Sequence, residues 1–183
     1  ERLFRKLTAH GIGDKISIWI KNWLIGRRQK VSLNKTYSNW ENVVSGVPQG
    51  SVLGPILFVI YINDLDIDVV SKLGKFADDT KLCQGVSSVS DVEKRDDLDK
   101  IFQWSLDWQM LFNVDKCTVV HMGQNNKEYE YKLGSNVLVK SVKERDLGVV
   151  ITADGKFSEQ CISSASKASQ VLGMIKRNIE YKS

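Results

Sequence analysis

The stretch from Val52 to Leu65 limits the possible folds more than any other part of this sequence. It is almost wholly apolar and long enough for one buried helix, but too short for a membrane span, which needs roughly 18 unbroken apolar residues. Pro55 lacks an amide hydrogen and is therefore tolerated only in the first turn of such a helix. The loop SGVPQGS comes directly before it. We therefore predict a buried helix that begins where a glycine-rich loop ends.

The composition is typical of a globular protein. The 183 residues are about one domain's worth, 42% apolar and 26% charged. A net charge of +4 permits a polyanionic partner without requiring one. The three cysteines are far apart and form no CxxC pair, so we expect no zinc site and predict reduced, buried thiols in an intracellular protein. Because the chain opens without an initiator Met, we expect it to be a piece of a longer protein.

Helical and strand patterns follow one another irregularly along the chain. Helices are predicted over 14–25 (ended by Gly26), 52–65, 90–111 (opened by the capping-box pair Ser90 and Glu93) and 158–181. Hairpins are predicted over 29–34 with 40–45, around the turn NKTYSN, and over 72–84, and single strands over 117–122, 129–133, 136–140 and 147–152. The mixture indicates an α+β fold, with a weak seam near 153–157.

The apolar faces of the helices are expected to form the core. Their members are Ile16, Trp19, Ile20, Trp23 and Leu24 in the first helix, Leu98, Ile101, Phe102, Trp108 and Leu111 in the third, and Ile162, Ala165, Leu172, Ile175 and Ile179 in the last. Stacking of tryptophans on nucleic-acid bases is an alternative for Trp19 with Trp23 and for Trp104 with Trp108, but their i, i+4 spacing favours core packing. His121 is expected to be structural.

Two adjacent carboxylates, Asp78 and Asp79, occur in the segment KFADDTKL. On a regular strand, neighbouring side chains point to opposite faces, whereas at a tight turn they converge. Two convergent carboxylates repel each other unless a divalent cation lies between them, and magnesium takes oxygen ligands. The alternative is an ordinary β-turn, because Asp favours turns.

The loop from Ser45 to Pro55 has the composition of a ligand-binding loop. Its glycines permit close approach of a ligand, and Gln49 offers an amide to a base, a sugar or a phosphate. The loop leads into a helix N-terminus, whose free N–H groups favour anions. A plain connector remains the alternative interpretation.

Together these segments resemble the reverse transcriptase domain of non-LTR (LINE-type, jockey-like) retrotransposons. SGVPQGSVLGPILFVIYINDL is similar to polymerase motif B, and KFADDTKL is similar to motif C, the metal-binding strand-turn-strand. WIKNWLIGRRQKV resembles the segment before motif B, FNVDKCTVVHMG resembles motif D, and ERDLGVVIT resembles motif E, the primer grip. The order and spacing of these segments agree with the family as well.

The resemblance implies RNA-directed DNA polymerase activity by a two-magnesium mechanism, with Mn²⁺ as a possible substitute, in which a primer 3′-hydroxyl attacks a deoxynucleotide. It implies a partial right-hand fold, with an antiparallel, helix-packed palm sheet over 1–152 and the start of a helical thumb or connection over 153–183. The implied residues are Asp78 and Asp79 as metal ligands and catalytic groups, Lys116 as a proton donor to pyrophosphate, Pro48, Gln49, Gly50 and Ser51 at the nucleotide and template, and Leu147, Gly148 and Val149 in the primer-grip strand. For Lys116 the alternative is a solvated strand-edge lysine, and for Leu147 and Val149 it is core packing.

One part of the family pattern does not occur in this sequence. Motif A, which supplies the third carboxylate in a DFSKAFD-like segment, has no counterpart before Asp78. We therefore expect a fragment that begins after motif A and does not polymerise alone. Asp64 in YINDL is interpreted as a helix-end residue. The expected remainder of the parent polyprotein comprises the upstream fingers and motif A, and the presence of an endonuclease domain is left open.

Basic residues gather in the first 35 positions, and we expect Arg27, Arg28 and Lys30 to contact a nucleic-acid backbone; a solvated face is the alternative. The expected partners are an RNA template, a DNA primer and deoxynucleotide triphosphates, without a membrane. The family implies a nuclear and cytoplasmic ribonucleoprotein. The competing hypothesis is a non-catalytic, nucleic-acid-binding relic or domesticated module. A viral RNA-dependent RNA polymerase is disfavoured by the PQGS-x-LGP loop.

Overall fold

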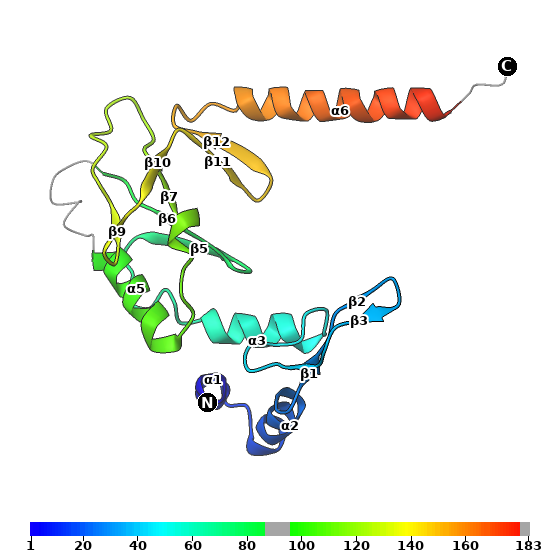
Figure 1. The fold of residues 1–183 in the computed structure, drawn as a ribbon. Coiled ribbons are helices and arrows are strands. Elements are labelled where there is room, and N and C mark those ends of the chain that lie inside the picture. The colour runs from blue at the N-terminus through cyan, green and yellow to red at the C-terminus, as the bar shows by residue number, and fades with distance from the viewer. Residues whose placement is uncertain (87–95, 180–183) are drawn as a thin grey trace. The chain divides into compact units, whose positions relative to one another are not determined.

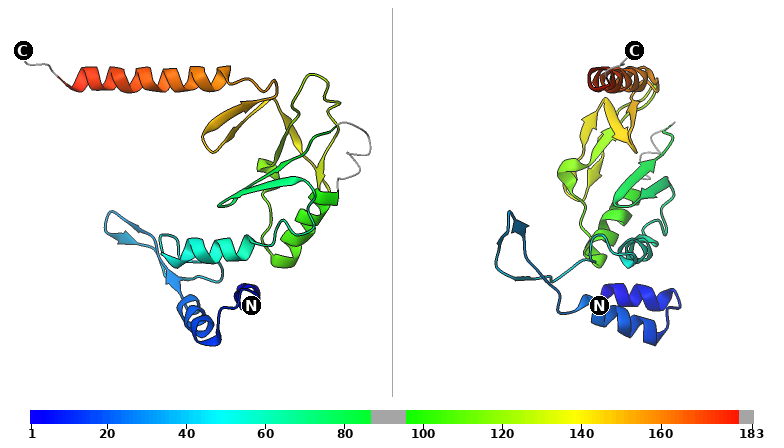
Figure 2. Two further views of the ribbon diagram at one scale, coloured as in Figure 1. Left: turned by 180° about the vertical axis from the view of Figure 1, so that it is seen from behind. Right: turned by 90° about the vertical axis from the view of Figure 1, so that its right-hand side faces the viewer.

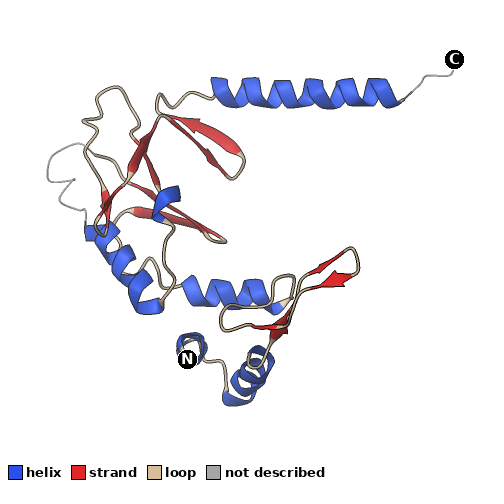
Figure 3. Cartoon of the chain, viewed as in Figure 1, coloured by secondary structure: helices blue, strands red, loops and turns tan. Residues whose placement is uncertain are grey.

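The computed structural model describes residues 1–86 and 96–179. The chain divides into two compact units, Glu1–Gln84 and Gly85–Ser183, of which the second is described over 85–86 and 96–179 (Figure 1). Helices and short strands are interleaved in both units, so the predicted α+β class is confirmed (Figure 3). No helix in the described ranges has the length and apolarity needed to cross a membrane.

The first unit contains three helices and three hairpin ladders. Its elements are α1 (Arg2–Ala9), α2 (Asp14–Leu24), β1 (Arg28–Gln29), β2 (Ser32–Leu33), β3 (Thr36–Tyr37), β4 (Glu41–Asn42), α3 (Leu53–Ile62), β5 (Lys72–Phe76) and β6 (Asp79–Cys83). The core lies where the helices meet, around Leu7, Ile20 and Leu57, and α1 lies beside α2 in Figure 2. Full burial of each such side chain stabilises the fold by about 1.5–3 kcal/mol.

Two of the three helices of this unit were predicted. Helix α2 begins and ends within one residue of the predicted range, and Pro55 lies in the first turn of α3. The burial predicted for α2 is partly wrong, because Ile20 is 3% exposed while Ile16 and Trp19 are more than half exposed. Helix α1 was not predicted.

The hairpin predicted around NKTYSN is present but consists of two short ladders. β1 pairs with β4, and β2 pairs with β3. The chain reverses at Asn34 and Lys35, which both have positive φ, so the turn is tighter than predicted.

In its described residues, the second unit consists of short strands between the helices α5 and α6. Its elements are α5 (Asp96–Trp108), the 3₁₀ turn η1 (Val114–Lys116), β7 (Thr118–Val120), β8 (Lys132–Leu133), β9 (Asn136–Val137), β10 (Val139–Ser141), β11 (Lys143–Asp146), β12 (Val149–Thr152) and α6 (Ser158–Asn178). Every sheet in the described ranges has two strands. All are antiparallel except β7 with β10, which differs from the expected antiparallel sheet. The strand β11 was not predicted.

The burial predicted for the last helix is wrong. No residue of α6 is buried, and Ile162, Leu172 and Ile175 are 66%, 51% and 43% exposed. Ala165 and Ile179 are exposed as well. Within the described ranges, α6 contacts β12 near its own first turn, so most of its apolar stripe has nothing to pack against. Tyr181, where the predicted helix ends, lies outside the described residues.

Helix α5 and the cysteines also differ from prediction. The capping-box residues Ser90 and Glu93 lie outside the described residues. Helix α5 ends at Trp108 because Gln109 has φ +53°, and this leaves Leu111 70% exposed. The predicted burial of the thiols is wrong for Cys83 and Cys161, which are exposed, while Cys117 is half-buried.

Candidate active site

The hairpin β5–β6 carries the two adjacent carboxylates at its tip. Five residue pairs hold the strands together, from Lys72 opposite Cys83 to Phe76 opposite Asp79. Ala77, with φ +51°, and Asp78 make the two-residue turn. Asp78 therefore lies in the turn itself and Asp79 lies at the first position of the following strand. The predicted hairpin with both carboxylates at its turn is confirmed.

The two faces of this hairpin have different surroundings. Exposed and half-buried residues alternate along both strands. Leu73, Lys75 and Leu82 lie on the half-buried face, whereas Phe76 and Asp79 lie on the exposed face. Both carboxylates are consequently accessible to solvent and to a ligand.

A lysine of β5 ties the half-buried face to the end of helix α3. Lys75 Nζ donates to the carbonyl oxygens of Ile62 (3.4 Å) and Asn63 (3.0 Å) and pairs with Asp66 Oδ1 at 2.7 Å. This hydrogen bond from Lys75 lowers the pKa of the Asp66 carboxyl below its ordinary value, against a smaller effect of burial.

At its other end, α3 begins in the glycine-rich loop, which is stabilised by hydrogen bonds between its own residues. Ser51 Oγ donates to the carbonyl oxygen of Pro48 at 2.7 Å and accepts from the Gly54 amide at 3.0 Å. A Cβ at position 54 would lie 2.9 Å from Ser51 Oγ and 3.0 Å from the Pro48 oxygen, so only glycine fits there without a shift. Gln49 and Gly50 are exposed at the apex of this loop.

The three predicted backbone-binding cations have different environments. Arg27 donates from Nε to the Leu24 carbonyl oxygen at 2.8 Å and from Nη2 to the Gly46 carbonyl oxygen, so it ties the end of α2 to the start of the glycine-rich loop. Arg28 and Lys30 are more exposed and lie against aromatic rings. Arg28 is 5.3 Å from the Trp40 ring centroid, and Lys30 is 4.0 Å from the Tyr37 centroid and 4.9 Å from that of Trp40.

Tyr37 and Trp40 are candidate functional residues that the sequence analysis missed. They are 59% and 51% exposed, and each has a cation over its ring. The signal that would have found them is an aromatic pair on the second arm of a hairpin whose first arm is basic. Of the two tryptophan pairs predicted above, Trp19 and Trp23 stack with centroids 6.2 Å apart and planes 4° apart, and Trp104 and Trp108 have centroids 6.4 Å apart and planes 36° apart.

The second unit carries the remaining predicted site residues. Lys116 ends the 3₁₀ turn η1 and is exposed, so it precedes β7 instead of lying on a strand edge. Leu147 (φ +48°) and Gly148 (φ +87°) form the two-residue turn between β11 and β12. The strand predicted from 147 therefore begins at Val149, because the two residues before it have left-handed backbone conformations.

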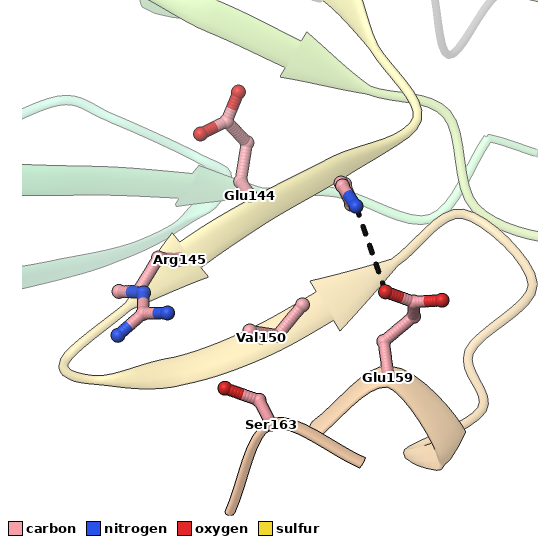
Figure 4. A pocket seen from close by; sticks show the side chains of 6 residues that line it. Glu144, Arg145, Val150, Glu159 and Ser163 are labelled. Carbon is pink, nitrogen blue, oxygen red and sulfur yellow. Dashed lines mark ion pairs between the residues drawn. The ribbon is translucent and has the colours of Figure 1, made fainter. Parts of the chain in front are cut away.

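A pocket of about 330 Å³ lies between this second hairpin and the start of α6 (Figure 4). Lys143, Glu144, Arg145, Val150, Glu159 and Ser163 line it. Lys143 and Glu159 form the ion pair drawn across it, at 3.5 Å. Two cations balance two carboxylates, and the predicted primer-grip residues do not line this pocket.

The carboxylates of Asp78 and Asp79 are oxygen ligands of the type that magnesium binds, but two of them make an incomplete ligand set. Among residues 1–86 and 96–179, no three His, Cys, Asp or Glu side chains are grouped as a metal site. Asp64 is paired with the buried Lys6, which fits its interpretation as a helix-end residue. Burial lowers the pKa of Lys6, although Asp64 opposes this effect. Asp78 and Asp79 thus offer oxygen ligands on a paired hairpin, and a complete site needs another contributor.

Comparison with known proteins identifies the family of the chain. The sequence profile of the reverse transcriptase (RNA-dependent DNA polymerase) family matches residues 1–175. The chain belongs to this family.

Its curated relatives come from fruit-fly mobile elements. A probable RNA-directed DNA polymerase from transposon X-element of Drosophila melanogaster is 35% identical over 110 residues. The RNA-directed DNA polymerases from mobile element jockey are 31% identical over 111 residues in Drosophila melanogaster and 32% over 113 residues in Drosophila funebris. Each match covers 55% of this chain and 12% of the relative.

Proposed function

We propose that this chain is part of an RNA-directed DNA polymerase that adds deoxynucleotides to a primer 3′-hydroxyl on an RNA template. The observation that carries the proposal is the position of Asp78 and Asp79 at the exposed tip of a paired hairpin, in a chain of the reverse transcriptase family. The proposal includes a palm-type fold over 1–152 and the start of a thumb or connection over 153–183.

Asp78 and Asp79 would hold magnesium, together with a further carboxylate. When bound, the metal supplies positive charge that stabilises the charge developing on the transferred phosphoryl group. The paired strands β5 and β6 hold the carboxylates, so little reorganisation is needed when the substrate arrives.

Gln49 and the start of α3 would position the incoming nucleotide. The Gln49 amide is exposed, and the helix N-terminus that follows the loop favours negative charge. Pro48, Gly50 and Ser51 shape this loop, and the Ser51 hydrogen bonds fix its exit into α3. Lys116 would donate a proton to the departing pyrophosphate, and Leu147, Gly148 and Val149 would support the primer.

Arg28, Lys30, Tyr37 and Trp40 form a cation-aromatic cluster, and the hairpin that carries it would bind the nucleic-acid strand. Arg28 and Lys30 would neutralise phosphates, and the exposed rings of Tyr37 and Trp40 would stack on bases. The same cluster supports the second candidate function, a module that binds nucleic acid without polymerising. Both candidate functions predict binding of nucleic acid, and only the polymerase predicts DNA synthesis.

The decisive experiment is a chimera in which this chain replaces the matched segment of the jockey polymerase. We expect magnesium-dependent primer extension on an RNA template by the chimera and none by the 183-residue chain alone, which supplies two adjacent carboxylates at the site. A chimera that folds and binds RNA but does not extend primers, beside an active parent, would favour the binding module. Extension by the chain alone would show that another of its carboxylates completes the site.

A further inference from the structure

The contacts of Lys75 are unusual for a lysine on a short strand. Its side chain is 19% exposed, and its ammonium group reaches three acceptors, the carbonyl oxygens of Ile62 and Asn63 and the carboxylate of Asp66. The acceptors lie at and just beyond the end of α3, where the last carbonyl groups of a helix lack intrahelical partners and a cation is favoured. Lys75 thus gives this helix end a partner from β5.

The backbone of the tip is connected to Lys75 through the ladder. Asp78 follows it by three residues, and Thr80 lies directly opposite it in the ladder. The turn has two residues, so the tip has little slack relative to the strands. Fixing Lys75 therefore restricts where Asp78 and Asp79 lie relative to α3.

Helix α3 connects the position of the hairpin to that of the glycine-rich loop. Its ten residues form a rod of about 15 Å. Ser51 fixes the glycine-rich loop to one end, through Pro48 and Gly54, and Lys75 fixes the hairpin to the other. Loop and hairpin are consequently held by the same helix.

We propose that Lys75 is a positioning residue that fixes the Asp78–Asp79 turn relative to α3 and, through α3, relative to Gln49. The proposal rests on the proposed function, because it concerns the turn that would bind the metal. The ammonium group of Lys75 is directed to its acceptors at and beyond the end of α3, so we assign it no contact with metal or substrate. The proposal changes neither the group transferred nor the metal used. Only the placement of the carboxylate ligands Asp78 and Asp79 depends on Lys75.

The test compares Lys75→Met with Lys72→Met in the 183-residue chain. Lys72 lies on the same strand but on the exposed face, so its substitution removes the same charge without removing the contacts to α3. We expect hydrogen-bonded hairpin amides, such as that of Lys81 opposite Gly74, to exchange about tenfold faster in Lys75→Met and at the wild-type rate in Lys72→Met. Equal exchange in both variants would overturn the proposal.

A second measurement follows the metal site. Manganese ions broaden NMR signals of nearby nuclei, and we expect the Asp78 and Asp79 amide signals to need several times more manganese for half-broadening in Lys75→Met than in Lys72→Met. An unchanged manganese titration beside faster exchange would overturn the link to ligand placement. If the wild-type chain shows no broadening, Asp78 and Asp79 do not bind manganese without the further carboxylate, and the exchange comparison alone decides the role of Lys75.

Asp66→Asn covers the case in which Lys75→Met does not fold. It removes the 2.7 Å ion pair and leaves both carbonyl acceptors in place. Exchange of the hairpin amides two- to threefold faster than in wild type, roughly the effect of one exposed ion pair, supports the proposal. Exchange at the wild-type rate overturns it.

Discussion

The hairpins β5–β6 and β11–β12 have the same backbone design but different tips. Each closes with a two-residue turn whose first residue is not glycine yet has positive φ, Ala77 at +51° and Leu147 at +48°. The first tip presents the carboxylates of Asp78 and Asp79. The second presents Leu147, which is 59% exposed, and Gly148. The same hairpin conformation thus presents two different surfaces, and the residues of the turn determine whether the surface is acidic or apolar.

The two hairpins also differ in how they are attached. Lys75 attaches the first to α3 through charged and carbonyl acceptors. The second is attached to α6 by Gln160, whose Oε1 accepts from the Val150 amide at 2.9 Å, and by the exposed pair of Lys143 with Glu159. Exposed ion pairs contribute about 0–1 kcal/mol, so the neutral hydrogen bond is the more important anchor of the second hairpin.

The largest expected difference between the hairpins is catalytic. In the jockey chimera, Asp78→Asn should reduce primer extension about a thousandfold, because losing a metal ligand removes several kcal/mol of charge stabilisation. Asp146→Asn, at the closing pair of the second hairpin, is the matched control and should change extension less than threefold. Steady-state extension in magnesium measures both. Full activity of Asp78→Asn would remove the distinction between the two tips.

Backbone strain at the turns gives the next effect. Gly148 has φ +87° with open space around it, so Gly148→Ala should destabilise its hairpin by about 1 kcal/mol through backbone conformation alone. Ala77→Gly should change the stability of the first hairpin by less than about 0.5 kcal/mol, because relieved strain is offset by backbone entropy. Amide exchange measures each hairpin separately. A loss of stability as large for Ala77→Gly as for Gly148→Ala would show that the two turns differ in backbone conformation.

Removing the neutral anchor should have a comparable or smaller effect. Gln160→Leu leaves the partly buried Val150 amide without its acceptor, which costs about 1 kcal/mol. Ser164→Ala, which removes the exposed hydrogen bond from Gln160 Nε2, is the control and should be nearly neutral. Faster exchange in β11–β12 only for Gln160→Leu is the expected result. Unchanged exchange would mean that α6 does not hold this hairpin.

The smallest effect is the pH dependence of the two anchors. Because the Lys75 hydrogen bond lowers the pKa of Asp66 below 3.8, its contribution is present above that value and is lost as the pH falls through the lowered pKa. The bond between Gln160 and Val150 does not titrate. NMR chemical shifts of the Lys75 side chain and of the Val150 amide between pH 5 and 2.5 should show a transition at Lys75 that Asp66→Asn removes. A transition that survives this substitution would assign the pH dependence to another group.

Local patterns predicted much of the fold and the tip of the first hairpin. The hairpin pattern over 72–84, with Asp78 and Asp79 near its turn, identified β5–β6, and Pro55 located the start of α3. Strand β11 was missed because its sequence, KERD, has no apolar residue, and its strand conformation depends on pairing with β12. The period of α6 identified its apolar stripe, but a period does not show whether another element covers it.

The attachments were beyond sequence reasoning for a different reason. Nothing next to Lys75 in the sequence distinguishes it from Lys72, and its partners lie 9 to 13 residues earlier in the chain. Likewise, the cations over Tyr37 and Trp40 depend on the register of two short ladders, which the composition of the loop between them does not determine.

The exposed thiol of Cys83 provides a built-in attachment point for a spectroscopic probe. Cys83 ends β6 on the same face as Asp79, about 13 Å along the strand from it. Burial raises the pKa of the Cys117 thiol and slows its modification, so Cys161→Ser alone would leave one readily labelled site. A nitroxide placed there would report distances to a paramagnetic metal ion at the hairpin tip without altering either carboxylate.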